Sequence, residues 1–311
     1  MSHGEPANEP SFERRTLFDG DWLQIGHIAV RPVSSACGEV EASALHVLAL
    51  PLAGVFAKHD GPRQQVIATP NHALLISAGR PYRLSFPGRI GDRCLALRFT
   101  SDALARVLPE ALGRDGFDTD TFSPHALLPP AVMLARSRLW RRFAHGDAVD
   151  PLEAEELGLH LLDATLHAVR REPAPPLRAT PGASWRRRRQ VTRTIEAICT
   201  QPERRWTLAD LAAQAHVSAS HLAHVFRAEI GLSVYGYVLR SRLARALDAV
   251  LDSDAGLTEI ALDAGFASHS HFTARFGALF GHTPLELRRG VHSAVARQLR
   301  RIVTAREALA A

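Results

Sequence analysis

Two stretches in the last third of the chain repeat one another and decide how that part folds. The first is TLADLAAQAHVSASHLAHVFRAEIG, from Thr207 to Gly231, and the second is LTEIALDAGFASHSHFTARFGALFG, from Leu257 to Gly281. Apolar positions before the turn recur at an offset of 49 residues and those after it at an offset of 50. Such an internal duplication is a stronger signal than one match to a pattern. Each copy predicts a short helix, a sharp turn and a second helix, the helix-turn-helix layout.

Turn and cap chemistry agrees with this layout. Thr207 with Asp210 is expected to cap the first helix of the first copy, and Ser218 to cap its second helix. Gly265 suits a left-handed turn residue, and His216 occupies the same place in the first copy. A helical hairpin without a role in DNA binding explains one copy, but it explains two copies on a basic domain poorly.

The segment between the copies, Ser233 to Leu251, has a helical pattern with its apolar residues on one side. A helix of that length forms a rod of about 27 Å. Successive major grooves on one face of DNA lie about 34 Å apart. One chain could therefore read two adjacent half-sites.

Charge separates the two parts of the chain. Residues 184–311 carry 18 arginines and 11 acidic residues, a net charge of +7, whereas residues 1–183 carry 19 basic and 21 acidic residues. A basic excess confined to one domain is typical of a protein that binds a polyanion. Four consecutive arginines, Arg186 to Arg189, either contact phosphate or form a solvated entry to the next helix.

The whole chain of 311 residues, 46% of them apolar, predicts two folded units. No apolar run approaches the roughly 20 residues of a membrane span, and no signal peptide is evident, so we expect a soluble cytoplasmic protein without a membrane partner. Cys37, Cys94 and Cys199 are scattered, which argues against disulfides and a zinc site.

The N-terminal part predicts antiparallel strands followed by helices, which makes the protein a two-domain α+β chain. Turn signals separate short strand-like runs between Trp22 and Phe99, namely LQIGHIAV, LHVLAL, QQVIAT, ALLIS, YRLSF and CLALRF. Helical patterns follow at 130–143 and from Asp150, which is expected as an N-cap, with Glu153 giving a start like a capping box. Leucines at 152, 159 and 166 form a heptad-like seam, which packs on the β domain or forms a dimer contact.

A larger set of residues carries a family resemblance over about the last 100 residues. The set comprises Tyr237, Arg242, Ala246, Glu259, Ile260, Ala261, Gly265, Phe266, Ser270, Phe272, Phe276, Gly281, Pro284 and Arg288. This series resembles the signature of the AraC family of transcriptional regulators. Leu287 stands where the family usually has an aromatic residue, and His224 and Ala274 stand where an arginine is frequent.

The resemblance implies a sequence-specific DNA-binding transcriptional regulator that is not an enzyme. Its expected partners are double-stranded DNA, RNA polymerase, an unknown small-molecule effector and a second copy in a homodimer. The expected domains are a cupin-like sensing and dimerisation domain (1–172), a proline-rich linker (173–183), a double helix-turn-helix domain of the AraC/XylS type (184–289) and a C-terminal helical tail (290–311).

A cupin-type enzyme fused to a DNA-binding module is the alternative class. The stretch from Pro70 to Arg83 is similar to the second cupin segment, but Tyr82 stands where metal-binding cupins place a histidine. Paired HxH ligands are absent as well, so we expect neither a metal nor another cofactor. A DNA-repair methyltransferase needs four thiolates for its zinc, and three separate cysteines cannot supply them.

Helical geometry names the candidate DNA contacts, because residues opposite buried Leu222 and Phe226 point outward. The alternative for each is plain solvent exposure. The candidates are Ser218, Ser220, His221, His224, Arg227, Arg240, Arg242, Arg245, Ser268, His269, Ser270 and Thr273.

Overall fold

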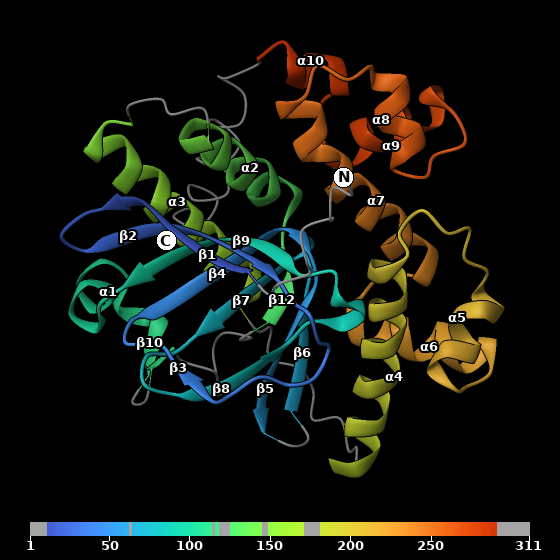
Figure 1. The fold of residues 1–311 in the computed structure, drawn as a ribbon, viewed down its shortest axis with the longest axis horizontal. Helices are drawn as coiled ribbons and strands as arrows, with labels where there is room; N and C mark the ends of the chain where they lie inside the picture. The colour runs from blue at the N-terminus through green and yellow to red at the C-terminus, as the bar shows by residue number, and fades with distance from the viewer. Residues whose placement is uncertain are drawn as a thin grey trace, which may run out of the picture.

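The computed structural model describes residues 11–61, 64–113, 116–117, 125–144, 149–170 and 181–290. It confirms a two-domain α+β chain, in which antiparallel sheets precede a helical C-terminal part (Figure 1). The C-terminal tail predicted from residue 290 lies outside the described residues except for Gly290.

The N-terminal part holds two main antiparallel sheets, the layout that a cupin-like domain requires. One sheet has the order β1-β2-β9-β4-β7-β12, the other the order β3-β8-β5-β6, and β10 pairs with β11. The strand bounds are β1 Ser11–Asp19, β2 Leu23–Arg31, β3 Glu41–Ala42, β4 His46–Gly54, β5 Phe56–Gly61, β6 Gln64–Ala68, β7 His72–Ile76, β8 Pro81–Ser85, β9 Asp92–Phe99, β10 Leu112–Gly113, β11 Gly116–Phe117 and β12 His125–Leu127. The six quoted runs are thus confirmed as strands.

Strand β1 is one that the sequence pattern did not reveal. Its sequence SFERRTLFD is largely exposed, so it lacks the apolar alternation that marks a half-buried strand. It pairs with β2 at the edge of the larger sheet, with an irregularity between Thr16 and Phe18.

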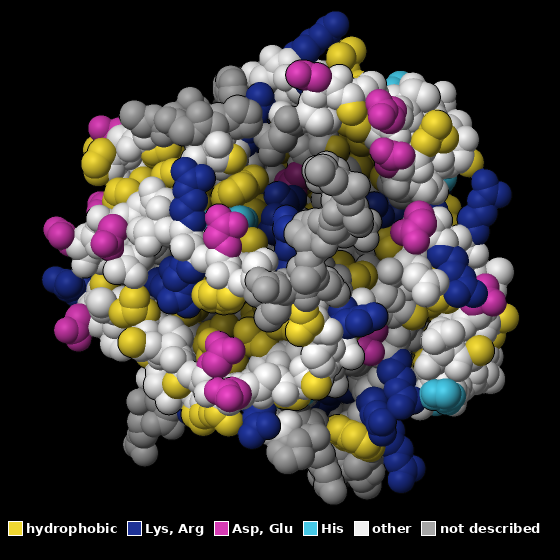
Figure 2. All heavy atoms as spheres, viewed as in Figure 1, with side chains coloured by type: hydrophobic (Ala, Val, Ile, Leu, Met, Phe, Trp, Pro, Cys, Tyr) yellow, Lys and Arg dark blue, Asp and Glu magenta, His cyan; other side chains and the backbone are white. Residues whose placement is uncertain are grey.

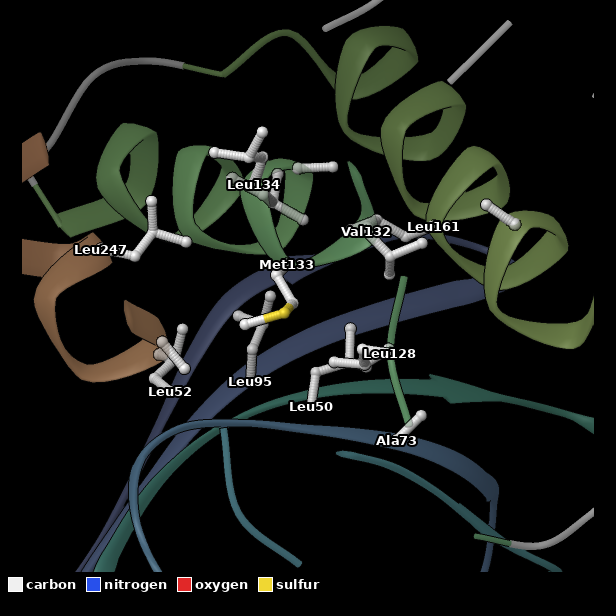
Figure 3. Packing of buried hydrophobic residues seen from close by; sticks show 14 of the residues in the cluster. Leu50, Leu52, Ala73, Leu95, Leu128, Val132, Met133, Leu134, Leu161 and Leu247 are labelled. Carbon is white, nitrogen blue, oxygen red and sulfur yellow. The ribbon is translucent and has the colours of Figure 1, made fainter. Parts of the chain in front are cut away.

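Two helices cover the larger sheet, and their packing forms the main core. The N-terminal helices are α1 Ser101–Val107, α2 Pro130–Ala144 and α3 Pro151–Val169, with 3-10 turns at Pro87–Arg89 and Pro109–Ala111. Figure 3 shows Leu50 and Leu95 of the sheet facing Met133 of α2, with Leu161 of α3 and Leu247 of the C-terminal part in the same cluster. Burial of these side chains is the dominant stabilising contribution in such a layer.

The start of α3 confirms one expectation and corrects another. The Asp150 side chain accepts hydrogen bonds from the backbone N–H groups of Leu152 and Glu153, as an N-cap should. The capping-box role expected for Glu153 is wrong, because its carboxylate pairs with Arg142 of α2, at 2.7 Å. Of the leucine seam, Leu166 is buried in the core, whereas Leu152 is 73% exposed.

The C-terminal part consists of seven described helices. They are α4 Pro181–Thr200, α5 Leu208–Ala215, α6 Ala219–Ile230, α7 Val234–Asp252, α8 Leu257–Asp263, α9 His269–Phe280 and α10 Pro284–Arg288. Since α4 begins at Pro181, the end of the predicted linker (173–183) is helical rather than extended, and the rest of that linker lies outside the described residues.

Helix α7 packs against the N-terminal domain as well as against its own. Leu239, Leu243 and Leu247 of α7 belong to the same buried cluster as Leu52 and Leu95 of the sheet. The cores of the two domains are therefore continuous through α7, and α4 also packs on the β domain, where Val191 and Ile195 share a buried cluster with Ile67.

Candidate nucleic-acid interface

The first helix-turn-helix unit consists of α5 and α6. Thr207 and Asp210 form a complete capping box at the start of α5, as the sequence predicted. His216 ends α5 in the left-handed conformation, with φ 57° and ψ 47°, which is uncommon for a residue with a side chain. The Ser218 hydroxyl then accepts a hydrogen bond from the His221 N–H at 3.2 Å and starts α6. The capping box at Thr207, the left-handed turn at His216 and the N-cap at Ser218 together fix the angle between α5 and α6.

The second unit, α8 and α9, repeats this layout with one difference. Gly265 has φ 85° in the turn, and the Ser268 hydroxyl accepts from the His271 N–H at 3.2 Å. Helix α8, however, starts at Gly256 with no side-chain cap. Phe272 and Phe276 are fully buried, so α9 is anchored on its inner face.

The outer faces of α6 and α9 carry most of the predicted contact residues. On α6 the side chains of Ser220, His221, His224 and Arg227 are exposed, and on α9 those of His269 and Ser270 are exposed while Thr273 is half-buried. The hydroxyls of Ser218 and Ser268 bond to their own helices, so they support these faces from the first turn. Both helices thus present short polar side chains and imidazoles, groups that can donate or accept hydrogen bonds.

The arginines of α7 do not join this surface. Arg240 reaches into the N-terminal domain, where its guanidinium donates to the Leu128 carbonyl. Arg242 donates to two carbonyls of the loop before α5, those of Pro202 and Arg204, at 3.3 and 3.1 Å. Since both guanidiniums hold protein carbonyls, the prediction that Arg240 and Arg242 contact DNA is not supported by their placement.

Arg245 is also directed elsewhere. Its side chain is exposed and forms a long ion pair with Glu203, at 3.8 Å. It lines a groove between the domains together with Asn71 and Ser241. A helical pattern reveals that an arginine is off the apolar face, but it does not reveal which neighbouring element that arginine meets.

Helix α4 adds a basic surface next to α6. Gln190 Oε1 lies 3.1 Å from His221 Nε2, and Arg187 pairs with Glu229 at 3.5 Å, so α4 is bonded to both ends of α6. Arg186 and Arg189 of the same helix are exposed. Figure 2 shows basic side chains gathered over α4 with a histidine beside them. The position of these arginines is compatible with both roles that the sequence left open, although Arg187 is held in its ion pair.

Three histidines of the N-terminal domain have hydrogen-bond partners within that domain. His46 Nε2 lies 2.9 Å from Ser101 Oγ, His59 Nε2 lies 2.8 Å from Ser85 Oγ, and His72 Nδ1 lies 2.9 Å from Thr69 Oγ1. Burial lowers the pKa of His46 and of His59, so both are neutral near pH 7. Among the described residues, no group of three His, Cys, Asp or Glu side chains is placed to hold a metal ion.

A cavity of about 470 Å³ opens between the two sheets of the N-terminal domain. Its apolar lining comes from both sheets and includes Ile28, Val47, Phe56, Ile76, Leu84 and Phe86. Polar side chains reach it at Arg14, Glu41, Tyr82, Asp92 and Arg98. Its size lies in the usual range for small-molecule sites.

Comparison with known proteins agrees with the geometry of the helical part. A family model described as a helix-turn-helix domain matches residues 211–290, which begins within α5 and covers the rest of both units. A putative AraC-like transcription regulator from Streptomyces lividans is 29% identical over 168 residues, 54% of this chain and 53% of the relative. Residues 211–290 are therefore a helix-turn-helix domain similar to that of AraC-like regulators. The HTH-type transcriptional regulator GlxA from Rhizobium meliloti is 33% identical over 158 residues, 46% of this chain and 48% of the relative.

The chain spans about half the length of these relatives. Among solved structures, the DNA-binding domain of AdpA in complex with a target DNA is 20% identical over 34% of this chain and 95% of that chain, with a TM-score of 0.32. ToxT from Vibrio cholerae O395 is 11% identical over 88% of this chain and 100% of that chain, with a TM-score of 0.34. The sequence matches carry the assignment of the AraC-type domain, since these structural scores are low.

None of the helices in the part of the chain that the structure describes combines the length and the apolar character that crossing a bilayer demands.

Proposed function

We propose that this protein is a sequence-specific DNA-binding transcriptional regulator whose β domain binds a small-molecule effector. The observation that carries the proposal is the pair of helix-turn-helix units with exposed polar faces on α6 and α9. The two units lie toward opposite ends of α7 (Figure 1). With 19 residues, α7 is about 28 Å long, close to the spacing of successive major grooves. In this proposal α6 and α9 enter adjacent grooves on one face of the duplex.

The contact set follows from the exposed faces. We assign base-edge contacts to Ser220, His224, His269, Ser270 and Thr273. Arg227 and His221 of α6 and the exposed arginines of the neighbouring helix α4 are assigned to phosphates, because basic side chains and imidazole N–H groups donate hydrogen bonds to phosphate oxygens. Arg240, Arg242 and Arg245 are left out of this set for the reasons of placement given above.

Selection of a binding site from random duplexes, followed by affinity measurements on variants, tests the proposal. His224→Ala and His269→Ala should each weaken binding to the selected site by about 1–3 kcal/mol while leaving binding to unrelated DNA nearly unchanged. Arg106→Ala, an exposed change on α1 of the β domain, is the matched control. Failure to select any site, or equal loss on selected and unrelated DNA, would contradict the proposal.

The remaining parts of the proposal concern regulation and assembly. The cavity between the sheets is the effector site that we propose, and RNA polymerase is the expected protein partner at a promoter, in the cytoplasm. Leu152, exposed at the start of α3, is available for a dimer contact. Sedimentation of the full chain and of Leu152→Glu tests that contact: the wild type should be dimeric at micromolar concentration and the variant shifted toward monomer.

We also propose that the protein is a regulator and not an enzyme.

The domain boundary is set near Pro181 rather than residue 184, since Val191 and Ile195 of α4 share a core with Leu211 and Phe226 of the first helix-turn-helix unit. Helix α4 therefore belongs to the DNA-binding domain in this proposal.

A further inference from the structure

Two arginines, Arg14 and Arg98, line the cavity on the larger sheet, from the two strands that flank β2. Arg14 of β1 is paired across from Ile28 of β2, and Arg98 of β9 is paired across from Gln24 of the same strand. Alternate residues of a strand face the same side, so Gln24, Gly26 and Ile28 all face the cavity. Gly26 therefore lies on β2 between the positions of the two arginines.

The missing side chain of Gly26 makes room for the guanidinium of Arg98. A Cβ atom at Gly26 would lie 2.6 Å from Nη1 of Arg98, a distance that real contacts do not reach. The guanidinium of Arg98 thus packs against the backbone of β2 at Gly26. Burial, and after it the positive charge of Arg14, lowers the pKa of Arg98.

No carboxylate neutralises this pair among the described residues. Arg14 lies over the ring of Phe12, at 5.7 Å, and neither arginine forms an ion pair within that part of the chain. Glu41 also lines the cavity. It lies on β3 of the other sheet, where it is paired across from Tyr82 of β8. Asp92 is at the opposite end of β9 from Arg98, about 20 Å away along the strand.

Arg98 is half-buried, whereas Arg14 is exposed at the edge of the cavity. A half-buried cation without a counter-ion is costly to keep unless a ligand supplies the negative charge. Much of the remaining lining is apolar, and its polar side chains include those of Glu41, Tyr82 and Asp92. We propose that the cavity binds a small organic anion that consists of a carboxylate group and a largely apolar remainder. In this proposal Arg14 and Arg98 bind the carboxylate group. Guanidinium groups bind carboxylates through two parallel hydrogen bonds, which gives both energy and orientation. This inference rests on the proposed effector role of the β domain and names the chemical class of its ligand.

The test uses the full chain and matched pairs of probes. Benzoate and octanoate are compared with benzamide and octanamide, which keep the apolar body and lose the charge, and inorganic phosphate supplies an anion without an apolar body. Binding is followed by calorimetry and by the shift in melting temperature. We expect at least one carboxylate to bind at least about tenfold more tightly than its amide and than phosphate.

Two independent variants report on the arginine pair. Arg98→Met removes one guanidinium, and Gly26→Ala displaces it while keeping every charge, so each should weaken carboxylate binding at least about tenfold. Arg98→Lys keeps the charge without the planar fork and should recover only part of the affinity. Arg106→Gln, an exposed arginine on α1, should bind like the wild type.

Several outcomes would overturn the inference. These are equal binding of carboxylates and amides, unchanged carboxylate binding in both Arg98→Met and Gly26→Ala, tighter binding of phosphate than of either carboxylate, and no binding of either carboxylate at millimolar concentration. DNA binding without probe is measured on the same samples. Loss of anion binding with DNA binding intact rejects only this inference, whereas absence of specific DNA binding rejects the proposed function.

Discussion

The side-chain amide of Asn71 donates a hydrogen bond from Nδ2 to Ser241 Oγ, at 2.9 Å. Asn71 precedes β7 in the N-terminal domain, and Ser241 lies in the middle of α7, the rod between the two helix-turn-helix units. Thr69 Oγ1 lies 3.4 Å from the buried Tyr237 hydroxyl one turn earlier on the same helix. Polar contacts, and not only apolar packing, therefore tie the β domain to α7.

Replacing Ser241 with alanine should destabilise the full chain by about 1–3 kcal/mol, because it leaves the buried Asn71 amide without its acceptor. Asn71 is 1% exposed, so water cannot replace the lost partner at little cost. The free energy of unfolding is measured by denaturant titration. Thr258→Ala, an exposed change on α8, is the control. Equal stability of the two variants would show that the contact contributes nothing.

Replacing Gly256 with serine should stabilise the protein by a few tenths of a kcal/mol. Gly256 is the N-cap of α8, its backbone is extended with φ −60° and ψ 140°, and a Cβ there would meet nothing within 4 Å. Glu259 stands three residues later, so the serine would complete a capping box like the one at Thr207. Gly256→Ala is the matched control, since it changes the backbone without adding an acceptor, and a serine variant no more stable than the alanine one contradicts the prediction.

The two turn residues should respond in opposite directions to matched changes. His216→Gly should stabilise by up to about 1 kcal/mol, because the left-handed conformation costs a histidine more than a glycine. Gly265→Ala should destabilise by at least that much, since its φ is 85° and the added Cβ would lie 3.0 Å from Arg242 Nε. Thermal unfolding of both variants measures this. Destabilisation in both would mean that the His216 side chain has a role that its turn geometry does not reveal.

Local features of the helical domain could be predicted from the sequence because their physics is local. Each of these features depends on residues that lie within one or two helical turns of one another in the sequence. Examples are a capping box, a left-handed turn residue and a phenylalanine repeated at a spacing of three or four residues on the buried face of a helix. For this reason the sequence correctly predicts the capping role of Thr207, the turn position of His216 and the N-cap at Ser218. The same is true of the β domain, where apolar alternation and turn residues gave six strands.

Features that depend on distant elements could not be predicted in this way. Arg240 and Arg242 sit on the non-apolar face of α7, and the sequence does not show that one meets Leu128 and the other the loop before α5. Strand β1 has no apolar alternation, so the cavity that it borders, with Arg14 at its edge, emerges only from the pairing of β1 with β2.

Asp92 should make the protein less stable as the pH rises from about 4 to 7. Burial raises the pKa of Asp92 from 3.8 to about 7, so the unfolded chain releases this proton at a lower pH than the folded chain does. The contribution is absent below pH 4, grows through that window and is constant above it, with a size on the order of 4 kcal/mol. Asp92→Asn should remove it. The difference in unfolding free energy between wild type and Asp92→Asn is measured from pH 4 to 8, with Asp21→Asn, an exposed change, as the control; a difference independent of pH contradicts the prediction.

Arg227 and Arg242 should separate DNA binding from folding. Arg227 is exposed on α6, whereas Arg242 is half-buried and holds the Pro202 and Arg204 carbonyls. Arg227→Met should leave the unfolding free energy nearly unchanged and reduce the slope of log affinity against log salt by about 1, as loss of one phosphate contact does. Arg242→Met should cost about 1–3 kcal/mol of stability, because it strands two carbonyls, and it should keep the salt slope of the wild type wherever the variant is folded. Affinity for the selected site at four salt concentrations, with denaturant unfolding of the same samples, measures both. An unchanged slope in Arg227→Met, or a reduced slope in folded Arg242→Met, would reverse the assignment of the two arginines, because only a side chain that neutralises phosphate can change counterion release.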